Sequence, residues 1–303
     1  MKLEGIFVPV TTPFQHQQLA LEKFALNFQY WEQFDLQGYV LLGSTGELPL
    51  LCEGERQAVV SRVLRSRLTS RSIIVGCAPE SLVEGVAFLA FARSAGADAA
   101  LVLPPHYYKS QMSEAILERF YLELAEQSQL PIILYHFPAI SGIAFSVEWV
   151  VRLSRHPRII GIKDSSGNLI FQQELVQRCA PDFSVLTGSA STLAASLLMG
   201  VHGGIVAAAN IVPAECVAIY RAARTGKCQT ARRLQEKILH INELITNKHG
   251  IGGLKYAMDQ IGLFGGEPRI PLQVPEDEAK EALKRELQAL FPDSALSPPT
   301  STS

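Results

Sequence analysis

Short apolar runs recur along the chain, and amphipathic segments of helical length separate them. Runs of about four to eight mostly apolar residues between turn signals are typical of strands buried in a parallel sheet. Such runs occupy 5–10, 38–42, 73–76, 99–103, 131–135, 159–163, 184–187 and 203–206. Between them, segments such as 54–68 and 113–128 have the pattern of helices with one apolar face, and Ser113 is expected to cap the second of these.

Strict alternation of strands and helices predicts an α/β fold with right-handed crossovers and a parallel sheet. Eight such units close most naturally into a (β/α)8 TIM barrel. A doubly wound open sheet is the main alternative, but a Gly-x-Gly-x-x-Gly turn does not follow the first strand, where the sequence is Val-Thr-Thr-Pro-Phe at 10–14. Dinucleotide binding is therefore disfavoured.

The remaining chain is too short for a second α/β domain. We expect the barrel to span 1–226 and a C-terminal helical extension, packed on the barrel, to span 227–291 with helices at 227–248, 253–261 and 276–290. Residues 292–303 are mainly Pro, Ser and Thr, which predicts a disordered tail.

Composition excludes several classes of function. Hydrophobic residues make up 48% of the chain, and 27 basic against 29 acidic side chains give a net charge of -2, so neither disorder nor a nucleic-acid partner is expected. No apolar stretch is long enough to cross a membrane. The start of the chain has the pattern of a strand and a turn rather than that of a signal peptide. The scattered cysteines lack CxxC spacing, which favours reduced thiols in a cytoplasmic protein over disulfides or a metal site. They are Cys52, Cys77, Cys179, Cys216 and Cys228.

Two neighbouring strands end in chemically capable residues, Tyr135 and Lys163. The carboxyl ends of parallel strands meet at one end of a barrel, where active sites lie, so the two side chains are expected to be neighbours. A charged ammonium is costly to bury; it either finds partners or loses its proton and becomes an amine nucleophile. A lysine that simply reaches solvent remains the alternative at this point.

Other predicted loops at the same end also carry polar groups. The turn at 43–47 presents the hydroxyls of Ser44 and Thr45 and several N-H groups to a small anion such as a carboxylate, although an ordinary turn in which Glu47 caps the next helix remains possible. Pro104 and Pro105 stiffen a loop that displays Tyr107.

Taken in order, four motifs resemble the family of pyruvate-dependent class I aldolases and synthases, which includes dihydrodipicolinate synthase and N-acetylneuraminate lyase. They are Gly-Ser-Thr-Gly-Glu at 43–47, Pro-Pro-His-Tyr-Tyr at 104–108, Tyr-His-Phe-Pro-Ala-Ile-Ser-Gly at 135–142 and Lys-Asp-Ser-Ser-Gly-Asn at 163–168. The resemblance covers about 3–272. It implies a TIM barrel with a helical C-terminal extension, usually assembled as a homotetramer, a dimer of tight dimers.

The resemblance also implies roles for individual residues. Lys163 matches the lysine that forms a Schiff base, Tyr135 the proton-shuttling tyrosine, and Ser44 and Thr45 the pair that binds the pyruvate carboxylate. Tyr107 matches the tyrosine that reaches into the neighbouring subunit's site, and backbone groups at Gly188 and Ile205 close the pocket behind the lysine. The expected partners are pyruvate and an aldehyde. No cofactor or metal is expected, because the covalent lysine imine is itself the electron sink.

The loops around the second substrate discriminate between family members. Dihydrodipicolinate synthases usually carry an arginine where this chain has Ile140, and an aliphatic side chain cannot form a bidentate ion pair. Sialic-acid lyases share Ser44 and Thr45 and an aliphatic residue at the Ile140 position, but they carry an acidic pair after strand seven, where this chain has Gly-Ser-Ala-Ser at 188–191. That difference counts against a long polyhydroxylated substrate.

Several segments look most like 4-hydroxy-2-oxoglutarate aldolases, which release pyruvate and glyoxylate (107–113, 163–165, 188–190, 250–255 and 264–272). Thr45 is a departure, because those enzymes commonly have asparagine there. Ser165 and Ser189 are candidates for binding the distal end of the substrate, with helix capping as the alternative for Ser165.

Other activities remain open. A synthase that condenses pyruvate with aspartate semialdehyde, a 2-keto-3-deoxy sugar acid aldolase, and a non-catalytic 2-oxo acid sensor would all fit the same barrel. Glu47, His106, His136 and Asp164 are interpreted as structural, because Tyr135 already fills the proton-transfer role.

Overall fold

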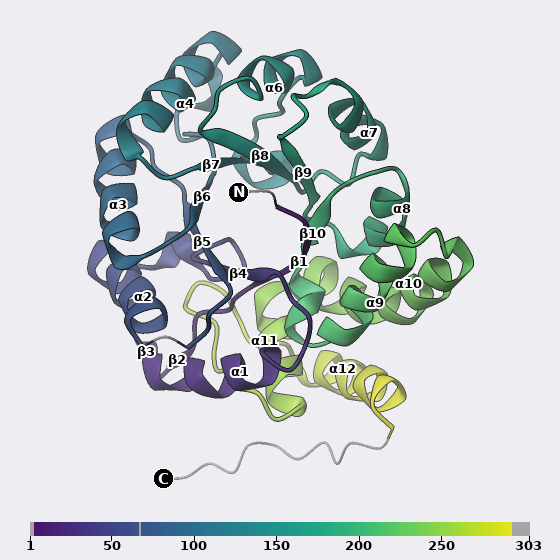
Figure 1. The fold of residues 1–303 in the computed structure, drawn as a ribbon. Helices are drawn as coiled ribbons and strands as arrows, with labels where there is room; N and C mark the ends of the chain where they lie inside the picture. Colours follow the sequence, from purple (N-terminus) through teal and green to yellow (C-terminus); the bar gives the residue numbers. More distant parts are fainter. Residues whose placement is uncertain (1–2, 67, 293–303) are drawn as a thin grey trace.

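The computed structural model describes residues 3–66 and 68–292, and its parallel strands close into a barrel (Figure 1). The eight barrel strands are β1 (Gly5–Pro9), β4 (Gly38–Leu41), β5 (Ser72–Cys77), β6 (Ala99–Val102), β7 (Ile132–His136), β8 (Ile159–Asp164), β9 (Ser184–Thr187) and β10 (Gly203–Ile205). Each observed end lies within one residue of the predicted run. The TIM barrel prediction is therefore confirmed.

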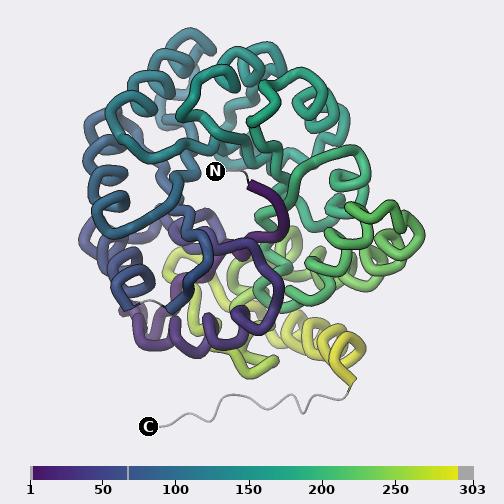
Figure 2. The backbone as a smooth tube through the Cα atoms, in the orientation of Figure 1, coloured from purple at the N-terminus to yellow at the C-terminus, as the bar shows by residue number. Residues whose placement is uncertain are grey.

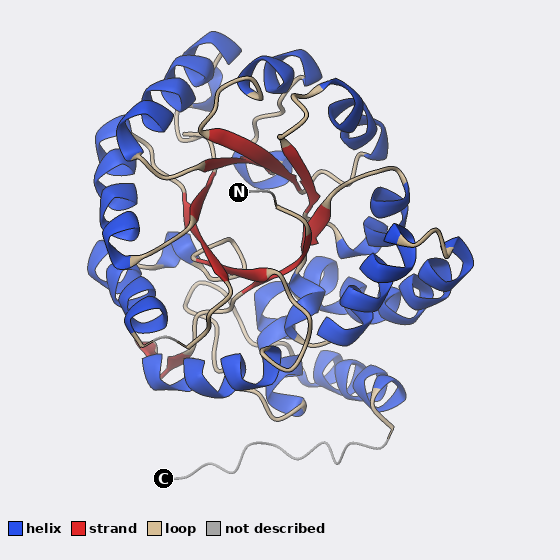
Figure 3. Cartoon of the chain, in the orientation of Figure 1, coloured by secondary structure: helices blue, strands red, loops and turns tan. Residues whose placement is uncertain are grey.

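Helices surround the strand ring on all sides in Figure 3. They follow the strands in the order α1 (Phe24–Trp31), α2 (Glu53–Arg65), α3 (Leu82–Ala95), α4 (Glu114–Ser128), α5 (Pro138–Ser141), α6 (Val147–Leu153), α7 (Leu169–Arg178), α8 (Leu193–Leu198) and α9 (Pro213–Arg224). The predicted N-cap of α4 is correct, since the Ser113 hydroxyl accepts a hydrogen bond from the Ile116 N-H.

Two apolar layers hold the barrel together. Alternate side chains of the strands fill its interior, where Leu3 joins them from the start of the chain, and the opposite set packs against the helices. The interior layer includes Phe7, Val40, Ile74, Leu101, Ile133, Leu186 and Ile205. Because Tyr135 belongs to this interior set, its phenol is directed into the barrel mouth rather than toward a helix.

A small antiparallel hairpin between the first barrel strand and α1 was not predicted. It pairs β2 (Phe14–Gln15) with β3 (Gln18–Leu19) through a turn in which His16 and Gln17 both have positive φ. Such turns normally carry Asn or Gly at these positions, and neither occurs here. The hairpin therefore lacks the usual sequence signal.

The C-terminal extension begins with α10 (Cys228–Asn242), which continues into a π-helix, η6 (Glu243–Lys248), followed by α11 (Gly250–Gln260) and α12 (Asp277–Leu290). The tube in Figure 2 shows that this part of the chain lies beside α9 and α1, outside the strand ring. α10 packs on α8 and α9, and α12 packs on α10 and α11. The predicted tail at 292–303 lies outside the described residues, apart from Pro292.

The helices of the described chain are all too short or too polar to span a lipid bilayer.

Candidate active site

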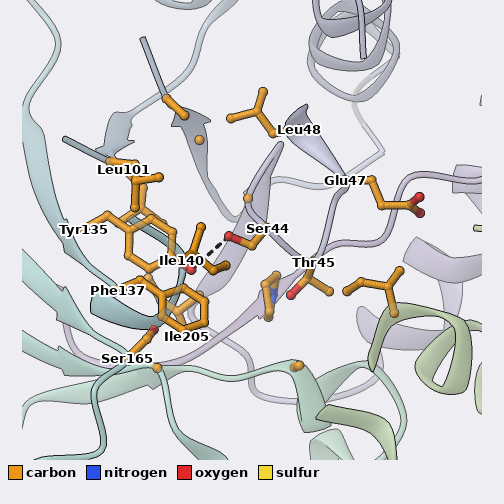
Figure 4. Close-up of a pocket in the computed structure, with 18 of the residues that line it drawn as sticks. Ser44, Thr45, Glu47, Leu48, Leu101, Tyr135, Phe137, Ile140, Ser165 and Ile205 are labelled. Carbon is orange, nitrogen blue, oxygen red and sulfur yellow. Dashed lines mark hydrogen bonds between the residues drawn. The ribbon is translucent and has the colours of Figure 1, made fainter. Parts of the chain in front are cut away.

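A cavity of about 790 Å³ opens at the carboxyl ends of the barrel strands. The predicted site residues that line it are Ser44, Thr45, Tyr135, Ile140, Lys163, Ser165, Gly188, Ser189 and Ile205. Figure 4 labels Ser44, Thr45, Tyr135, Ile140, Ser165 and Ile205 among them. They come from the ends of five different strands and the loops that follow. The cavity is the place where this fold normally holds its reacting groups.

Lys163 occupies the next-to-last position of β8 and is 5% exposed. The strand register places it directly opposite Tyr135 of β7. Lys163 Nζ lies 3.3 Å from the Tyr135 hydroxyl and 4.4 Å from the centre of the phenol ring. The solvent-facing alternative for Lys163 is therefore wrong: its amine is buried against a phenol, at the mouth of the barrel.

The Tyr135 hydroxyl has a second neighbour on the opposite side of the cavity. Its oxygen lies 3.3 Å from Ser44 Oγ, the contact drawn as a dashed line in Figure 4. Ser44, Tyr135 and Lys163 thus form a continuous hydroxyl, phenol and amine relay. Both distances are within hydrogen-bond reach, which proton transfer between these groups requires.

The turn that carries Ser44 and Thr45 is held in an unusual backbone conformation. Leu42 before it and Glu47 at its end both have positive φ, at 55° and 57°. A residue other than glycine adopts this conformation at a cost, which is typical of functional turns. Gly76 on β5 makes room for it, because a Cβ at that position would lie 1.9 Å from the Leu42 carbonyl oxygen.

Behind this turn, the buried carboxylate of Glu47 forms an ion pair with Lys255 of α11, at 2.5 Å between Oε1 and Nζ. Its other oxygen accepts the Arg269 N-H at 2.7 Å. Desolvation lowers the pKa of Lys255, and the Glu47 carboxylate opposes that shift. Glu47 is therefore structural, as predicted, but it joins the turn to the C-terminal extension and makes no capping hydrogen bond with its side chain.

Gly188, after β9, sets the floor of the cavity. A Cβ at this position would lie 2.0 Å from Ser165 Oγ and 2.9 Å from Lys163 Cε, so the two side chains occupy the space that a larger residue would need. The capping alternative for Ser165 is wrong, because the N-cap of α7 is Asn168. The Ser165 hydroxyl is therefore free to face the cavity.

Two predicted residues are far more exposed than the rest. Ile140, on the short helix α5, is 48% exposed at the cavity rim. Tyr107 is 77% exposed and stands outside the lining of its own chain's cavity, packed edge-on against Tyr108 at 5.0 Å between ring centres. A direct role for Tyr107 in its own chain's site has no geometric support here.

The sequence reasoning missed the contribution of the C-terminal extension. Asn242 at the end of α10, and Thr246 and Asn247 on the π-helix, line the cavity opposite the strand ends. Asn242 donates a hydrogen bond to Ser191 Oγ at 2.8 Å. The available signal was Lys255, a charged residue within a mostly apolar and glycine-rich stretch, which indicates a helix face turned toward a buried carboxylate.

Comparison with known proteins identifies the family. The family model described as "Dihydrodipicolinate synthetase family" matches residues 2–290. The chain belongs to this family. The family resemblance predicted from the sequence is thereby confirmed, and with it the prediction that the protein is an enzyme, a pyruvate-dependent aldolase or lyase.

Relatives of similar identity in the dihydrodipicolinate synthetase family carry different names. The chain is 32% identical over 277 residues to a 4-hydroxy-tetrahydrodipicolinate synthase from Roseobacter denitrificans, covering 91% of this chain and 94% of the relative. It is also 32% identical over 286 residues to an Emericella nidulans protein named "Probable 4-hydroxy-2-oxoglutarate aldolase, mitochondrial", covering 92% of each. Overall similarity therefore does not separate the two activities.

A solved structure of the family has the same fold. The dihydrodipicolinate synthase from Acinetobacter baumannii, determined in complex with pyruvate, superposes with a TM-score of 0.89 at 27% identity, covering 94% of this chain and 98% of that one. The helical extension is thus included in the shared architecture.

Proposed function

We propose that the protein is a Schiff-base aldolase that reversibly cleaves a short 4-hydroxy-2-oxo acid, with 4-hydroxy-2-oxoglutarate as substrate and pyruvate and glyoxylate as products. One observation carries the mechanism: the buried Lys163 amine and the Ser44 hydroxyl both lie 3.3 Å from the Tyr135 oxygen, at the floor of one cavity. This arrangement provides a nucleophile with a proton carrier at hydrogen-bond distance.

In this proposal, the neutral amine of Lys163 attacks the keto carbon of the substrate. Tyr135 donates its proton to the resulting hydroxyl, which leaves as water and yields an iminium ion. The bond between C3 and C4 then breaks, and its electron pair forms an enamine with the iminium as electron sink. The Tyr135 phenolate takes the proton of the 4-hydroxyl, and the aldehyde is released.

The second half of the reaction regenerates the enzyme. The enamine takes up a proton at C3 from Tyr135, and water adds to the imine carbon, returning a proton to the phenolate. Collapse of this adduct frees pyruvate and the neutral amine. Throughout, in this proposal, Ser44 and Thr45 hold the pyruvate carboxylate through their hydroxyls and the N-H groups of their turn, and both residues line the cavity.

The distal half of the cavity supports a short substrate. Ser165 and Ser189 offer hydroxyls, and Ile140 at the rim offers only hydrocarbon. The turn at 188–191 carries no acidic side chain for a row of sugar hydroxyls. A small aldehyde such as glyoxylate can be held here by hydroxyls and backbone donors without a cationic partner.

A synthase activity is the second candidate, because the Roseobacter denitrificans relative is named for it. A product screen distinguishes the candidates: the protein is given 4-hydroxy-2-oxoglutarate, 2-keto-3-deoxygluconate, N-acetylneuraminate, and pyruvate with aspartate semialdehyde. We expect the highest kcat/KM with the first. Condensation with aspartate semialdehyde as the fastest reaction would replace the proposed substrate while leaving the imine mechanism intact.

The imine itself is tested with pyruvate and borohydride. Hydride adds to the iminium carbon and leaves a stable secondary amine, so peptide mass spectrometry should find the adduct on Lys163 in the native protein and none in Lys163→Ala. Full turnover by Lys163→Ala would refute the mechanism. Pyruvate binding without turnover of any aldehyde would instead support a non-catalytic 2-oxo acid sensor.

We also propose that the chain assembles into a homo-oligomer, a dimer of dimers. The exposed phenols of Tyr107 and Tyr108 support this proposal, because large aromatic side chains in contact on a surface are typical of interfaces. Light scattering after size-exclusion chromatography gives the assembly size. A monomer with full activity would remove any role of Tyr107 in a neighbouring site.

A further inference from the structure

The residues that follow Tyr135 and Lys163 in their strands form a second pair. The strand register sets Tyr135 opposite Lys163 and, one step on, His136 opposite Asp164. Because side chains alternate between the faces of a strand, this second pair lies on the helix side, behind the cavity. His136 is 4% exposed and Asp164 is fully buried.

The hydrogen bonds of His136 fix the orientation of its ring. Its Nδ1 lies 2.7 Å from Asp164 Oδ1, and its Nε2 accepts the Phe145 N-H at 3.2 Å. Because Nε2 accepts this N-H, Nδ1 is the ring nitrogen that donates to the carboxylate. The imidazole also stacks on the Phe145 ring at 5.0 Å.

Asp164 connects the loops that follow three neighbouring strands. Its Oδ1 accepts the Ser166 N-H at 3.1 Å, and its Oδ2 accepts Gln172 Nε2 at 2.8 Å. The same Gln172 nitrogen donates to Thr187 Oγ1 at 3.3 Å, and that hydroxyl also accepts the Ser189 N-H at 3.2 Å. Through His136 and Phe145, the network continues into the segment that follows α5, the short helix that carries Ile140.

This network is more than the strands need in order to pair. The backbone ladder between β7 and β8 already joins them, and apolar side chains could pack on the helix side at much smaller desolvation cost. Both oxygens of Asp164 and both ring nitrogens of His136 are hydrogen-bonded, and buried polar groups paired in this way select one arrangement of the groups attached to them. The groups attached here are Tyr135, Lys163 and the loops of the distal half.

We infer that His136 and Asp164 are positioning residues, which hold the Tyr135 phenol and the Lys163 amine in register and fix the loops that carry Ser165 and Ser189. This inference rests on the proposed imine mechanism. It extends that mechanism by assigning a role to two residues that do not touch the substrate. Neither side chain lines the cavity, whereas the neighbour of each does.

The test replaces each member, and a second, more exposed pair of histidine and carboxylate serves as the control. Asp164→Asn keeps the shape and replaces the charged acceptor of Nδ1 with a neutral amide, and His136→Phe removes the bond between the two side chains. The control is His156, at the opposite end of β8, which has the same bonding pattern: Nε2 lies 2.8 Å from Glu126 Oε1, and Nδ1 accepts the Arg158 N-H at 3.2 Å. His156→Phe removes that bond, and Glu126→Gln neutralises its acceptor, outside the lining of the cavity.

Pyruvate alone is the probe, so the physiological aldehyde need not be known. The rate of borohydride trapping reports imine formation, and deuterium uptake into the pyruvate methyl group reports proton transfer in the enamine. We expect both rates to fall by about ten- to a hundredfold in Asp164→Asn and His136→Phe, since a displacement of about 1 Å can cost a hundredfold. The control variants should match the native protein.

Further variants separate positioning from folding. His136→Asn retains a donor at the place of Nδ1, and should recover most of the rate lost in His136→Phe. Gln172→Leu removes only the outer branch of the network, and should slow aldol cleavage more than imine trapping; it also serves if the inner variants do not fold.

The outcomes are distinct. Native protein that gives no trapped adduct contradicts the proposed function itself. Native trapping together with unchanged rates in folded Asp164→Asn and His136→Phe overturns the positioning role. Equal losses in the control variants would do the same, because they would show a general effect on stability. Melting temperatures measured on every variant confirm that rates are compared between folded proteins.

Discussion

The two halves of the cavity are built differently. In the half that we propose binds pyruvate, called the pyruvate half below, Ser44, Tyr135 and Lys163 form one relay. They lie on strand ends and on a turn that a buried ion pair supports from behind. In the distal half, which we propose holds the rest of the substrate, Ser189 lies on a loop. Ile140 lies on a short helix at the rim, and its side chain is half-exposed. The first half is built on strand ends with a buried ion pair behind its turn, whereas the rim of the second half faces solvent at Ile140.

This difference suggests a division of roles, in which the pyruvate half carries the reacting groups and the distal half determines which substrate is accepted. Strand ends in a closed barrel are fixed by backbone pairing on both sides, so groups placed there keep their geometry. Loops and short helices on the rim can change without disturbing that geometry. Relatives with different names at the same overall identity are consistent with a fixed pyruvate half and a variable distal half.

The largest effect is expected from the centre of the pyruvate half. Tyr135→Phe removes the proton carrier between Ser44 and Lys163, and should lower kcat by about 10²–10⁴-fold, the usual contribution of a general acid or base. Steady-state kinetics with the substrate found in the product screen measures it. Ile140→Ala is the counterpart in the distal half and should change KM more than kcat. Comparable losses of kcat in Tyr135→Phe and Ile140→Ala would contradict the division of the cavity into a catalytic half and a specificity half.

The support behind the pyruvate half can be broken separately. Lys255→Met leaves the Glu47 carboxylate buried without its ion-pair partner, and should lower the free energy of unfolding by about 3–5 kcal/mol. Urea denaturation measures the loss. Adding Glu47→Gln should recover part of it, since the second change removes the uncompensated charge. Two losses that simply add would show that the pair is not coupled.

Gly188→Ala tests the boundary between the halves. Its new methyl group would overlap Ser165 Oγ and crowd Lys163 Cε, and overpacking of this kind costs about 1–3 kcal/mol. We expect slower imine trapping with pyruvate and a larger loss with the full substrate. Gly54→Ala is a suitable control, because a Cβ at that position meets nothing within 4 Å. Unimpaired trapping and turnover in Gly188→Ala would show that Ser165 can move away freely.

The smallest effect concerns pH. The hydrogen bond from Arg269 lowers the pKa of Glu55, which ties the segment after α11 to α2. A carboxyl whose pKa is lower in the folded protein stabilises it above the usual value of 4.5, and that contribution is lost as the pH falls through the folded value. We expect Glu55→Gln to cost about 1 kcal/mol or less at neutral pH.

Urea denaturation at several pH values measures this contribution. The difference between Glu55→Gln and the native protein should shrink as the medium is acidified below pH 4.5, because the native carboxyl is then protonated as well. A difference that stays constant across this range would mean that the Glu55 contact stabilises the fold by packing rather than by charge.

The sequence was enough to predict the strands and the residues at their ends. Runs such as 159–163 are apolar throughout because both faces of a barrel strand are buried, and that pattern is visible without coordinates. Strand ends in a parallel barrel converge by topology, so the meeting of Tyr135 and Lys163 could also be predicted. The hairpin at 14–19 could not, because its turn residues lack the usual preference for positive φ.

Contacts between distant segments were decided only by the tertiary structure. Glu47 and Lys255 are far apart in the chain, and each alone has the pattern of an ordinary charged residue; only the packing of α11 against the turn at 43–47 reveals an ion pair. The same holds for Asn242 at the cavity and for Asp164 behind it. The pattern of apolar residues along the chain determines the strands and helices and the residues at their ends, because burial repeats with the period of a strand or a helix. Partners of single polar side chains depend on how those elements pack, which no local pattern encodes.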